Sequence, residues 1–221
     1  MASCYPLSDI SRGRYHVSPC MEIAPLLGYT VRLAYESEFN HLPNVERAAA
    51  QRFLPYLEQL EIPVALIEGL TPLQFLRRAQ LENRLWVAVP TREADQAMNS
   101  SQKGAQQPVG FLVAKFLPEG CFVVELSVHP THGRMGLGSA LVEACCEGAR
   151  SRCADRILLT TFRHVPWNIP FYQKLGFEIL PAEKWSPDIS AIVDHETRYG
   201  FAQKHRAVMM RMLSSNTLPG V

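Results

Sequence analysis

The stretch HPTHGRMGLGSALV, residues 129–142, places a turn with three glycines between a β-branched run and an apolar helical run. Where a strand enters a helix through such a turn, the first N–H groups of the helix lack intrahelical acceptors, and the positive end of the helix dipole faces outward. Such a turn binds anions, most often phosphate. Gly133, Gly136 and Gly138 let the backbone approach a ligand closely, and Arg134 adds a positive charge suited to a diphosphate.

The spacing of these glycines separates three phosphate-binding patterns. The P-loop requires G-x-x-x-x-G-K-[S/T], and it is excluded because no lysine follows any of the glycines. The dinucleotide fingerprint G-x-G-x-x-G would put Leu141 where a third glycine is required, and no parallel βαβ unit precedes it. The third pattern, x-x-x-G-x-G/A after LSVHP (126–130), fits the sequence.

The rest of the chain alternates between strand-like and helix-like segments. Runs of β-forming residues predict strands at 29–35, 85–89, 109–116, 121–129, 156–162, 177–180 and 206–213. Apolar periodicity predicts helices at 36–60, 71–84, 138–152, 168–176 and 186–200. We expect Pro43 to break or restart the first helix, and Thr71 and Ser186 to be N-caps. This order predicts an α+β fold with helices around one mixed sheet.

Length and charge limit the organisation and the partners. A chain of 221 residues suits one domain, which we expect at 28–214, after an N-terminal arm (1–27) and before a C-terminal tail (215–221). A polar loop is expected at 90–108. The formal net charge of +1 provides no broad field for nucleic acid or an anionic membrane, so we expect recognition in a local pocket.

The N-terminus and the cysteines bear on the compartment. The first 20 residues lack the apolar core of a signal peptide, and no apolar run is long enough to span a membrane. We therefore expect a soluble, cytoplasmic protein. The six cysteines include no C-x-x-C pair, which argues against a zinc site or a disulfide framework and predicts reduced thiols without a bound metal.

Two motifs about thirty residues apart carry a family resemblance. The segment 124–177 resembles the GNAT superfamily of acyl-CoA N-acyltransferases. ELSVHPTHGRMGLGSALV (125–142) is similar to that family's strand 4, pyrophosphate loop and helix 3, and NIPFYQKLGF (168–177) is similar to a later family element. LTTFRHVPWNIPFYQKLGF (159–177) further resembles a poorly characterised bacterial and fungal subgroup. The resemblance implies one GNAT-like domain, with a twisted, mostly antiparallel mixed sheet and helices on both faces.

The resemblance also implies a donor site for acetyl-CoA. The backbone of Leu126, Ser127 and Val128 would pair with the pantetheine arm, and Asn168 would contact that arm. The diphosphate would be held by six consecutive backbone N–H groups, those of Arg134, Met135, Gly136, Leu137, Gly138 and Ser139. Tyr172 would lie near the sulfur as proton donor. One departure is Gly133, where the family usually has Gln or Arg, and it bears on affinity for the diphosphate.

Each catalytic candidate has a structural alternative. Tyr172 could be a core aromatic with a satisfied hydroxyl, and Asn168 could be a helix N-cap. Glu125 interrupts an apolar strand beside the expected thioester and is the first candidate for general base, with His164 as the second. By strand alternation, Glu125 shares a face with Ser127, opposite Val124 and Val128.

Several further residues fit both a functional and a structural role. Glu36 and Glu38 fit helix-dipole stabilisation, although this region often borders the acceptor pocket in the family. Tyr35 and Trp167 either line an amine pocket or pack. His129 and His132 flank the turn and either help position phosphate or have no role.

The function predicted from these motifs is transfer of an acetyl group from acetyl-CoA to a primary amine, within a ternary complex. A small-molecule acceptor is favoured. A protein or peptide acetyltransferase and a non-catalytic CoA-binding module are the alternatives, and the sequence leaves both monomer and homodimer open.

Overall fold

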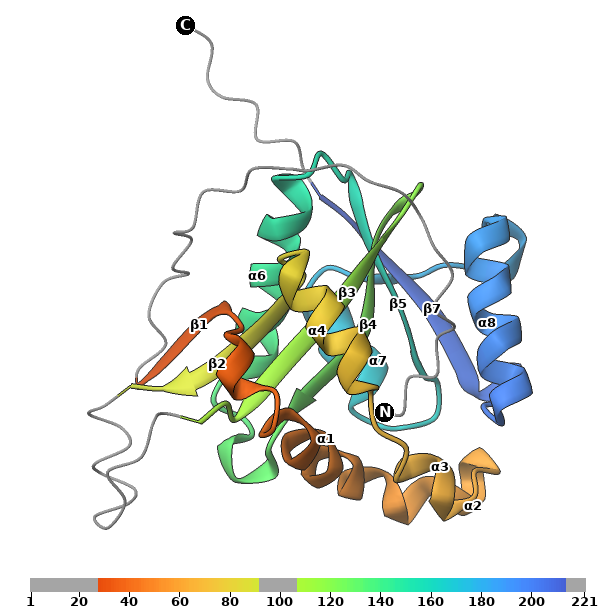
Figure 1. Cartoon of the computed structure of the whole chain (residues 1–221). Coiled ribbons are helices and arrows are strands. Elements are labelled where there is room, and N and C mark those ends of the chain that lie inside the picture. The colour runs from red at the N-terminus through yellow and green to blue at the C-terminus, as the bar shows by residue number, and fades with distance from the viewer. Residues whose placement is uncertain (1–27, 92–106, 214–221) are drawn as a thin grey trace, which may run out of the picture.

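The computed structural model describes residues 28–91 and 107–213, which form one seven-stranded sheet (Figure 1). The strand order is β1-β2-β3-β4-β5-β7-β6. Every neighbouring pair is antiparallel except β4 and β5, which are parallel. The strands are β1 Tyr29–Leu33, β2 Leu85–Pro90, β3 Gly110–Leu117, β4 Gly120–Val128, β5 Arg156–Phe162, β6 Glu178–Ile179 and β7 Arg206–Met212. The predicted mixed sheet is confirmed.

Helices cover both faces of the sheet (Figure 1). They are α1 Leu42–Ala50, α2 Leu57–Leu60, α3 Val64–Ile67, α4 Leu73–Leu81, α6 Leu137–Arg150, α7 Asn168–Lys174 and α8 Pro187–Tyr199. Short 3₁₀ turns occur at Glu36–Glu38, Gln51–Tyr56, Pro130–His132, Ala182–Lys184 and Gln203–His205. α6 and α7 pack on one face, whereas α1, α4 and α8 pack on the other. The two-sided α+β arrangement is therefore confirmed.

The first predicted helix is divided. The range 36–60 contains a 3₁₀ turn, then α1, a second 3₁₀ turn and α2. Pro43 lies in the first positions of α1, where its missing N–H costs nothing, so the predicted restart is confirmed. Pro55 lies within the second 3₁₀ turn, consistent with a proline interrupting regular α-helical bonding. The short helix α3 was not predicted.

The two predicted N-caps differ in outcome. Ser186 caps α8, because its Oγ accepts a hydrogen bond from the Ile189 N–H at 3.1 Å. Thr71 does not cap α4, since Pro72 occupies the N-cap position and the helix begins at Leu73. The Thr71 N–H and hydroxyl instead donate to the Glu46 carboxylate.

Three predicted segments fall wholly or largely outside the described residues. These are the arm at 1–27, the part of the 90–108 loop between 92 and 106, and the tail at 215–221. Within the two described ranges, no helix has both the length and the apolar character needed to cross a membrane.

The central strands β4 and β5 separate toward their carboxyl ends. They pair only from Cys121–Val123 to Ile157–Leu159, although β4 continues to Val128 and β5 to Phe162. Figure 1 shows the two strands diverging downward, toward α1 and α7. This divergence opens the sheet where both predicted motifs meet.

Candidate active site

The diverging part of β4 presents backbone groups on its β5 side. The His129 N–H donates to the Val109 carbonyl of the neighbouring chain segment at 2.8 Å, so the alternation of an antiparallel ladder turns the backbone groups of Ser127 toward β3 as well. The groups of Leu126 and Val128 consequently face the β5 side, where pairing has ended. Of the three residues expected to pair with pantetheine, Leu126 and Val128 are oriented for it and Ser127 is turned toward β3.

The glycine turn joins β4 to α6. Arg134 and Gly136 both have left-handed backbone angles, with φ of 62° and 79°, and Gly136 is the N-cap of α6. The first N–H that bonds back to this cap is that of Ala140, to the Gly136 carbonyl at 3.0 Å. The N–H groups of Leu137, Gly138 and Ser139 thus form the first turn, whose donors are available to an anion.

The turn is held by contacts outside the glycines. The Tyr29 hydroxyl and His132 Nδ1 lie 2.7 Å apart, and His129 Nδ1 lies 2.7 Å from the Thr131 hydroxyl. These bonds give both flanking histidines structural contacts. A Cβ at Gly133 would lie 3.0 Å from the Pro130 carbonyl oxygen, so the 3₁₀ turn favours glycine where the family usually has Gln or Arg.

Glu125 lies at a β-bulge in β4. The register passes from Val113 opposite Glu125 to Ala114 opposite Val123, which leaves Val124 as an extra residue. Val124 packs with the clusters on the α1, α4 and α8 side, and Val128 packs on the α6 side. The predicted opposition of Glu125 to Val124 is wrong because the bulge shifts the alternation, whereas its opposition to Val128 is confirmed.

The Glu125 carboxylate is buried beside two other candidates for chemistry. The side chain is 3% exposed, and its Oε1 accepts a hydrogen bond from the Ser127 hydroxyl at 2.9 Å. Its negative charge acts on two neighbours, Glu46 of α1 and Tyr172 of α7. The three groups therefore share one electrostatic environment at the carboxyl ends of β4 and β5.

Glu46 is a buried acid that was not among the residues predicted from the sequence. It is 1% exposed, and both carboxylate oxygens accept the Thr71 N–H at 3.0 Å while Oε1 also accepts the Thr71 hydroxyl at 2.9 Å. Burial and the charge of Glu125 raise the pKa of Glu46 to about 7. The available signal was its helical spacing, because Glu46 lies four residues after Leu42 and four before Ala50, both buried.

Tyr172 is buried on the α6 and α7 side of the sheet. Its ring makes edge contacts with Phe171 and Phe177 at centroid distances of 5.0 and 5.7 Å. Burial, and next the charge of Glu125, hold its pKa well above the usual value for tyrosine, opposed by the positive charge of Arg206. The hydroxyl therefore remains protonated at neutral pH.

Asn168 does not cap α7. Trp167 occupies the N-cap position and makes no side-chain cap bond, and Asn168 is the first helical residue. The Asn168 side chain is 6% exposed, and its Nδ2 has no hydrogen-bond partner among the described residues. Because buried amides rarely remain without a partner, this amide is consistent with a position that a ligand completes.

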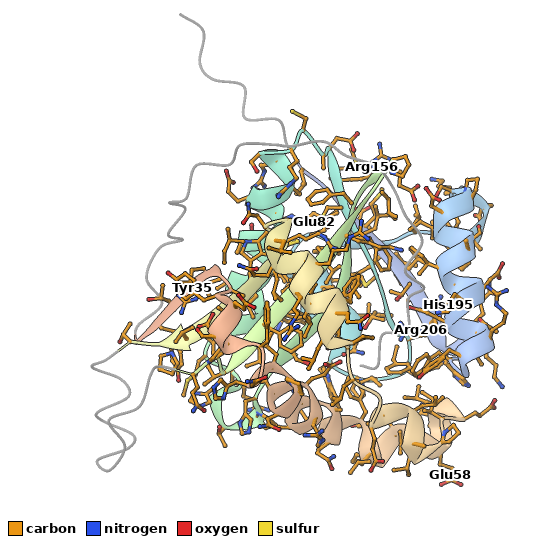
Figure 2. All side chains as sticks on the ribbon, viewed as in Figure 1. Tyr35, Glu58, Glu82, Arg156, His195 and Arg206 are labelled. Atoms are coloured by element: carbon orange, nitrogen blue, oxygen red, sulfur yellow. The ribbon has the colours of Figure 1, made fainter. Side chains whose placement is uncertain are left out.

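Arg206 belongs to a buried ion pair next to this site. Its guanidinium donates to both oxygens of Glu196, at 2.9 and 3.0 Å, and to the Thr160 hydroxyl at 2.8 Å. Arg206, labelled in Figure 2, opens β7. Glu196 lies on α8. Phe162 packs under the guanidinium, 4.7 Å from its ring centroid. The positive charge of Arg206 is thus matched by Glu196.

Other predicted candidates have structural contacts. Arg32 and the Tyr35 N–H bind Glu38, whereas Glu36 is exposed. His164 is exposed and packs edge-on against His205. The two aromatic candidates differ, since Trp167 packs on Phe53 and Tyr56, whereas Tyr35 is 59% exposed beneath Arg32. In the described part of the chain, no three His, Cys, Asp or Glu side chains gather as a set of metal ligands.

The family profile described as the acetyltransferase (GNAT) family matches residues 67–177, which is 111 of the 221 residues. This range contains the bulged strand, the glycine turn and Tyr172. The chain belongs to the GNAT acetyltransferase family. The resemblance inferred from the two motifs is thereby confirmed.

Solved structures share the fold of this GNAT acetyltransferase at low identity. The ribosomal-protein-S18-alanine N-acetyltransferase from Escherichia coli is 14% identical, with 87% of this chain and 99% of that chain covered and a TM-score of 0.52. The PaiA N-acetyltransferase from Thermoplasma acidophilum, solved with coenzyme A, is 14% identical over 83% and 98%, with a TM-score of 0.54. At this identity the likeness concerns the fold.

A longer protein shares the same domain fold. N-acetylglutamate synthase from Neisseria gonorrhoeae, complexed with coenzyme A and N-acetyl-glutamate, is 14% identical, with a TM-score of 0.56. The match covers 84% of this chain and 35% of that one. The chain thus spans about a third of that protein's length.

Proposed function

We propose that this GNAT acetyltransferase transfers an acetyl group from acetyl-CoA to a primary amine of a small molecule. The observation that carries the proposal is the divergence of β4 and β5 after Val123. The first turn of α6, with N–H donors for an anion, lies beyond the separated end of β4. Two buried ionisable groups, Glu125 and Tyr172, lie at the same carboxyl ends of β4 and β5.

The donor would lie along β4. The first-turn N–H groups of α6, at Leu137–Ser139, bind the diphosphate, and the exposed Arg134 adds charge. The backbone groups of Leu126 and Val128 bind the pantetheine arm as an added strand would, and Asn168 Nδ2 donates to the same arm. The backbone of Arg134, Met135 and Gly136 then forms the turn that surrounds the phosphates.

The reaction would proceed by direct attack. Glu125 accepts the proton of the acceptor ammonium, directly or through water, and the amine lone pair attacks the thioester carbonyl carbon. A C–N bond forms while a β4 N–H stabilises the oxyanion. The attacking nitrogen then loses its second proton to water, the C–S bond breaks, and CoA leaves as the thiolate. Tyr172 donates a hydrogen bond to the leaving thiolate. Because its pKa is held well above the usual value, Tyr172 acts mainly as a hydrogen-bond donor rather than by full proton transfer.

The acceptor side favours a compact cationic molecule. Two buried carboxylates, Glu46 and Glu125, create a negative environment there. Helices α2 and α3 pack through Leu60 and Ile67 into one apolar cluster with Phe162 at the end of β5. This packing covers the end of β5 and leaves less room for a protein chain than for a small amine.

The proposal is tested by calorimetric titration of the protein with acetyl-CoA, followed by CoA release with a panel of mono-, di- and polyamines. We expect binding, and turnover that is fastest with compact cationic amines. Mass spectrometry of proteins and peptides incubated with the enzyme tests the alternative acceptor class, since acetylated lysines or N-termini would overturn the small-molecule assignment. Failure to bind acetyl-CoA would overturn the donor assignment.

A further inference from the structure

A second buried polar atom near the donor site has no assigned role. Thr161, in β5, is 0% exposed, and its hydroxyl has no hydrogen-bond partner anywhere in residues 28–91 and 107–213. A buried hydroxyl without a partner is costly to the fold, because it has lost its bonds to water and gained none. Such an atom calls for an explanation beyond packing.

The direction of Thr161 follows from its neighbours along β5. Ile157 and Leu159 belong to the core cluster formed with α6 and with Tyr172 of α7. Since side chains alternate along a strand, Thr161 faces that same side. Thr160 faces the opposite side, where its hydroxyl is bonded to Glu196 and Arg206. Two adjacent threonines of one strand therefore differ in that one hydroxyl is satisfied and the other is not.

The unpartnered hydroxyl lies in the same strand–helix unit as the unpartnered amide of Asn168. α7 follows β5 after a short loop and packs on the α6 side of the sheet, and Asn168 lies one helical turn before Tyr172. Both atoms are therefore on the side of β5 that carries Tyr172, where β4 and β5 have diverged. Two buried polar atoms without partners in one unit point to a ligand that supplies both donors and acceptors.

We infer that the Thr161 hydroxyl is a further binding group of the donor site and hydrogen-bonds an amide of the pantetheine arm. This inference rests on the proposed function, because it takes acetyl-CoA as the donor. The arm contains amide N–H and C=O groups, and a hydroxyl both donates and accepts, so the two chemistries match. Thr161 then holds the arm from the β5 side, opposite the β4 backbone.

The test compares Thr161→Val with Thr161→Ser and Thr160→Val in the full chain. Valine keeps the shape of threonine and removes the hydroxyl, so we expect Thr161→Val to raise the Kd for CoA about fivefold in calorimetry. Its melting temperature should stay the same or rise, because the hydroxyl has no partner in the unliganded fold. Thr161→Ser should bind CoA within about twofold of the wild type.

The nucleotide part of CoA without the arm, adenosine bisphosphate, is the matched ligand control. Its Kd should be the same for wild type and Thr161→Val. Thr160→Val is the control for a bonded hydroxyl and should lower the melting temperature by several degrees.

Three results would overturn the inference. If Thr161→Val lowers the melting temperature as Thr160→Val does, the Thr161 hydroxyl contributes to the fold. If Thr161→Val raises the melting temperature and CoA binding is unchanged, the Thr161 hydroxyl has no ligand in CoA. Equal weakening of CoA and adenosine bisphosphate would place the effect away from the arm. A wild-type chain that binds no CoA would overturn the proposed function itself, and the wild-type titration distinguishes that failure from the others.

Discussion

Two buried glutamates on the same side of the sheet have opposite surroundings. Glu196 of α8 is bonded to the Arg206 guanidinium and to the Thr160 hydroxyl. Glu46 of α1 is bonded within the described residues to Thr71, which carries no charge, and it lies beside a second buried carboxylate, Glu125. The Glu196 charge is neutralised and belongs to the fold. The Glu46 carboxylate is instead bonded to an uncharged residue and faces a second buried acid, an arrangement expected where a cationic substrate completes the site.

The largest expected effect is a loss of stability when the Arg206–Glu196 ion pair is broken. Arg206→Met should lower the free energy of unfolding by about 3–5 kcal/mol, because Glu196 would be left buried without its counter-charge. Chemical denaturation measures the loss. The double variant Arg206→Met, Glu196→Leu should recover much of it, because both charges are then absent. A loss below about 1 kcal/mol would contradict the assignment of this pair to the fold.

Removing the charge at Glu125 should affect catalysis rather than folding. Glu125→Gln keeps the acceptor for the Ser127 hydroxyl and should lower kcat/KM about 1000-fold near neutral pH, since the general base is lost. The Kd for acetyl-CoA should change little. Steady-state kinetics and calorimetry give the two quantities. A rate within tenfold of the wild type would assign the base elsewhere, with the exposed His164 as the next candidate.

The charge at Glu46 should appear as a pH dependence of stability. Its folded-state pKa of about 7 lies above the usual value of 4.5, so the folded protein holds a proton that the unfolded chain releases. The stability contributed by Glu46 is then fully present below about pH 4.5 and is lost as pH rises to about 7, by about 3 kcal/mol. Glu46→Gln keeps an acceptor for Thr71 and should remove this loss.

The measurement for Glu46 is urea unfolding of both proteins at several pH values. The free energy of unfolding of Glu46→Gln minus that of the wild type should increase as pH rises from about 4.5 to about 8. Glu196→Gln is the matched control, because it removes a neutralised charge and should be destabilising at neutral pH. A pH-independent difference for Glu46→Gln would show that the two glutamates do not differ in the way proposed.

The sequence predicted the donor-binding turn and its strands better than the buried acidic groups. The glycine turn, the strands around it and the start of α7 follow from local signals that each lie within a short segment. The bulge at Val124 left no such signal, because the residues before it on β4 are uniformly apolar and show no alternation to interrupt. The contact between Glu46 and Thr71 joins positions 25 residues apart, so it depends on how α1 and α4 pack.

The sequence also did not predict which buried polar atoms have hydrogen-bond partners. Thr160 and Thr161 read as equivalent members of one apolar run, and only the packing of α7 and α8 on opposite faces distinguishes them. Asn168 before Ile-Pro has the pattern of an N-cap, yet the helix begins at Asn168 itself because Trp167 takes the cap position. Local pattern thus identified the residue and gave the wrong structural role.

Tyr172 should show the smallest catalytic effect. Tyr172→Phe removes the hydrogen-bond donor at the thiolate and should lower kcat about tenfold, with acetyl-CoA affinity and melting temperature nearly unchanged. Burial and the charge of Glu125 hold the pKa of Tyr172 well above its usual value, so the ratio of wild-type to Tyr172→Phe rates should stay constant from about pH 7 to about pH 10. A ratio that falls toward the alkaline end would mean that the hydroxyl ionises there, and an unchanged turnover at all pH values would favour a protein that binds CoA without catalysis by this group. In the double variant with Glu125→Gln the hydroxyl loses its negative neighbour, and a constant ratio there too would assign the raised pKa to burial alone.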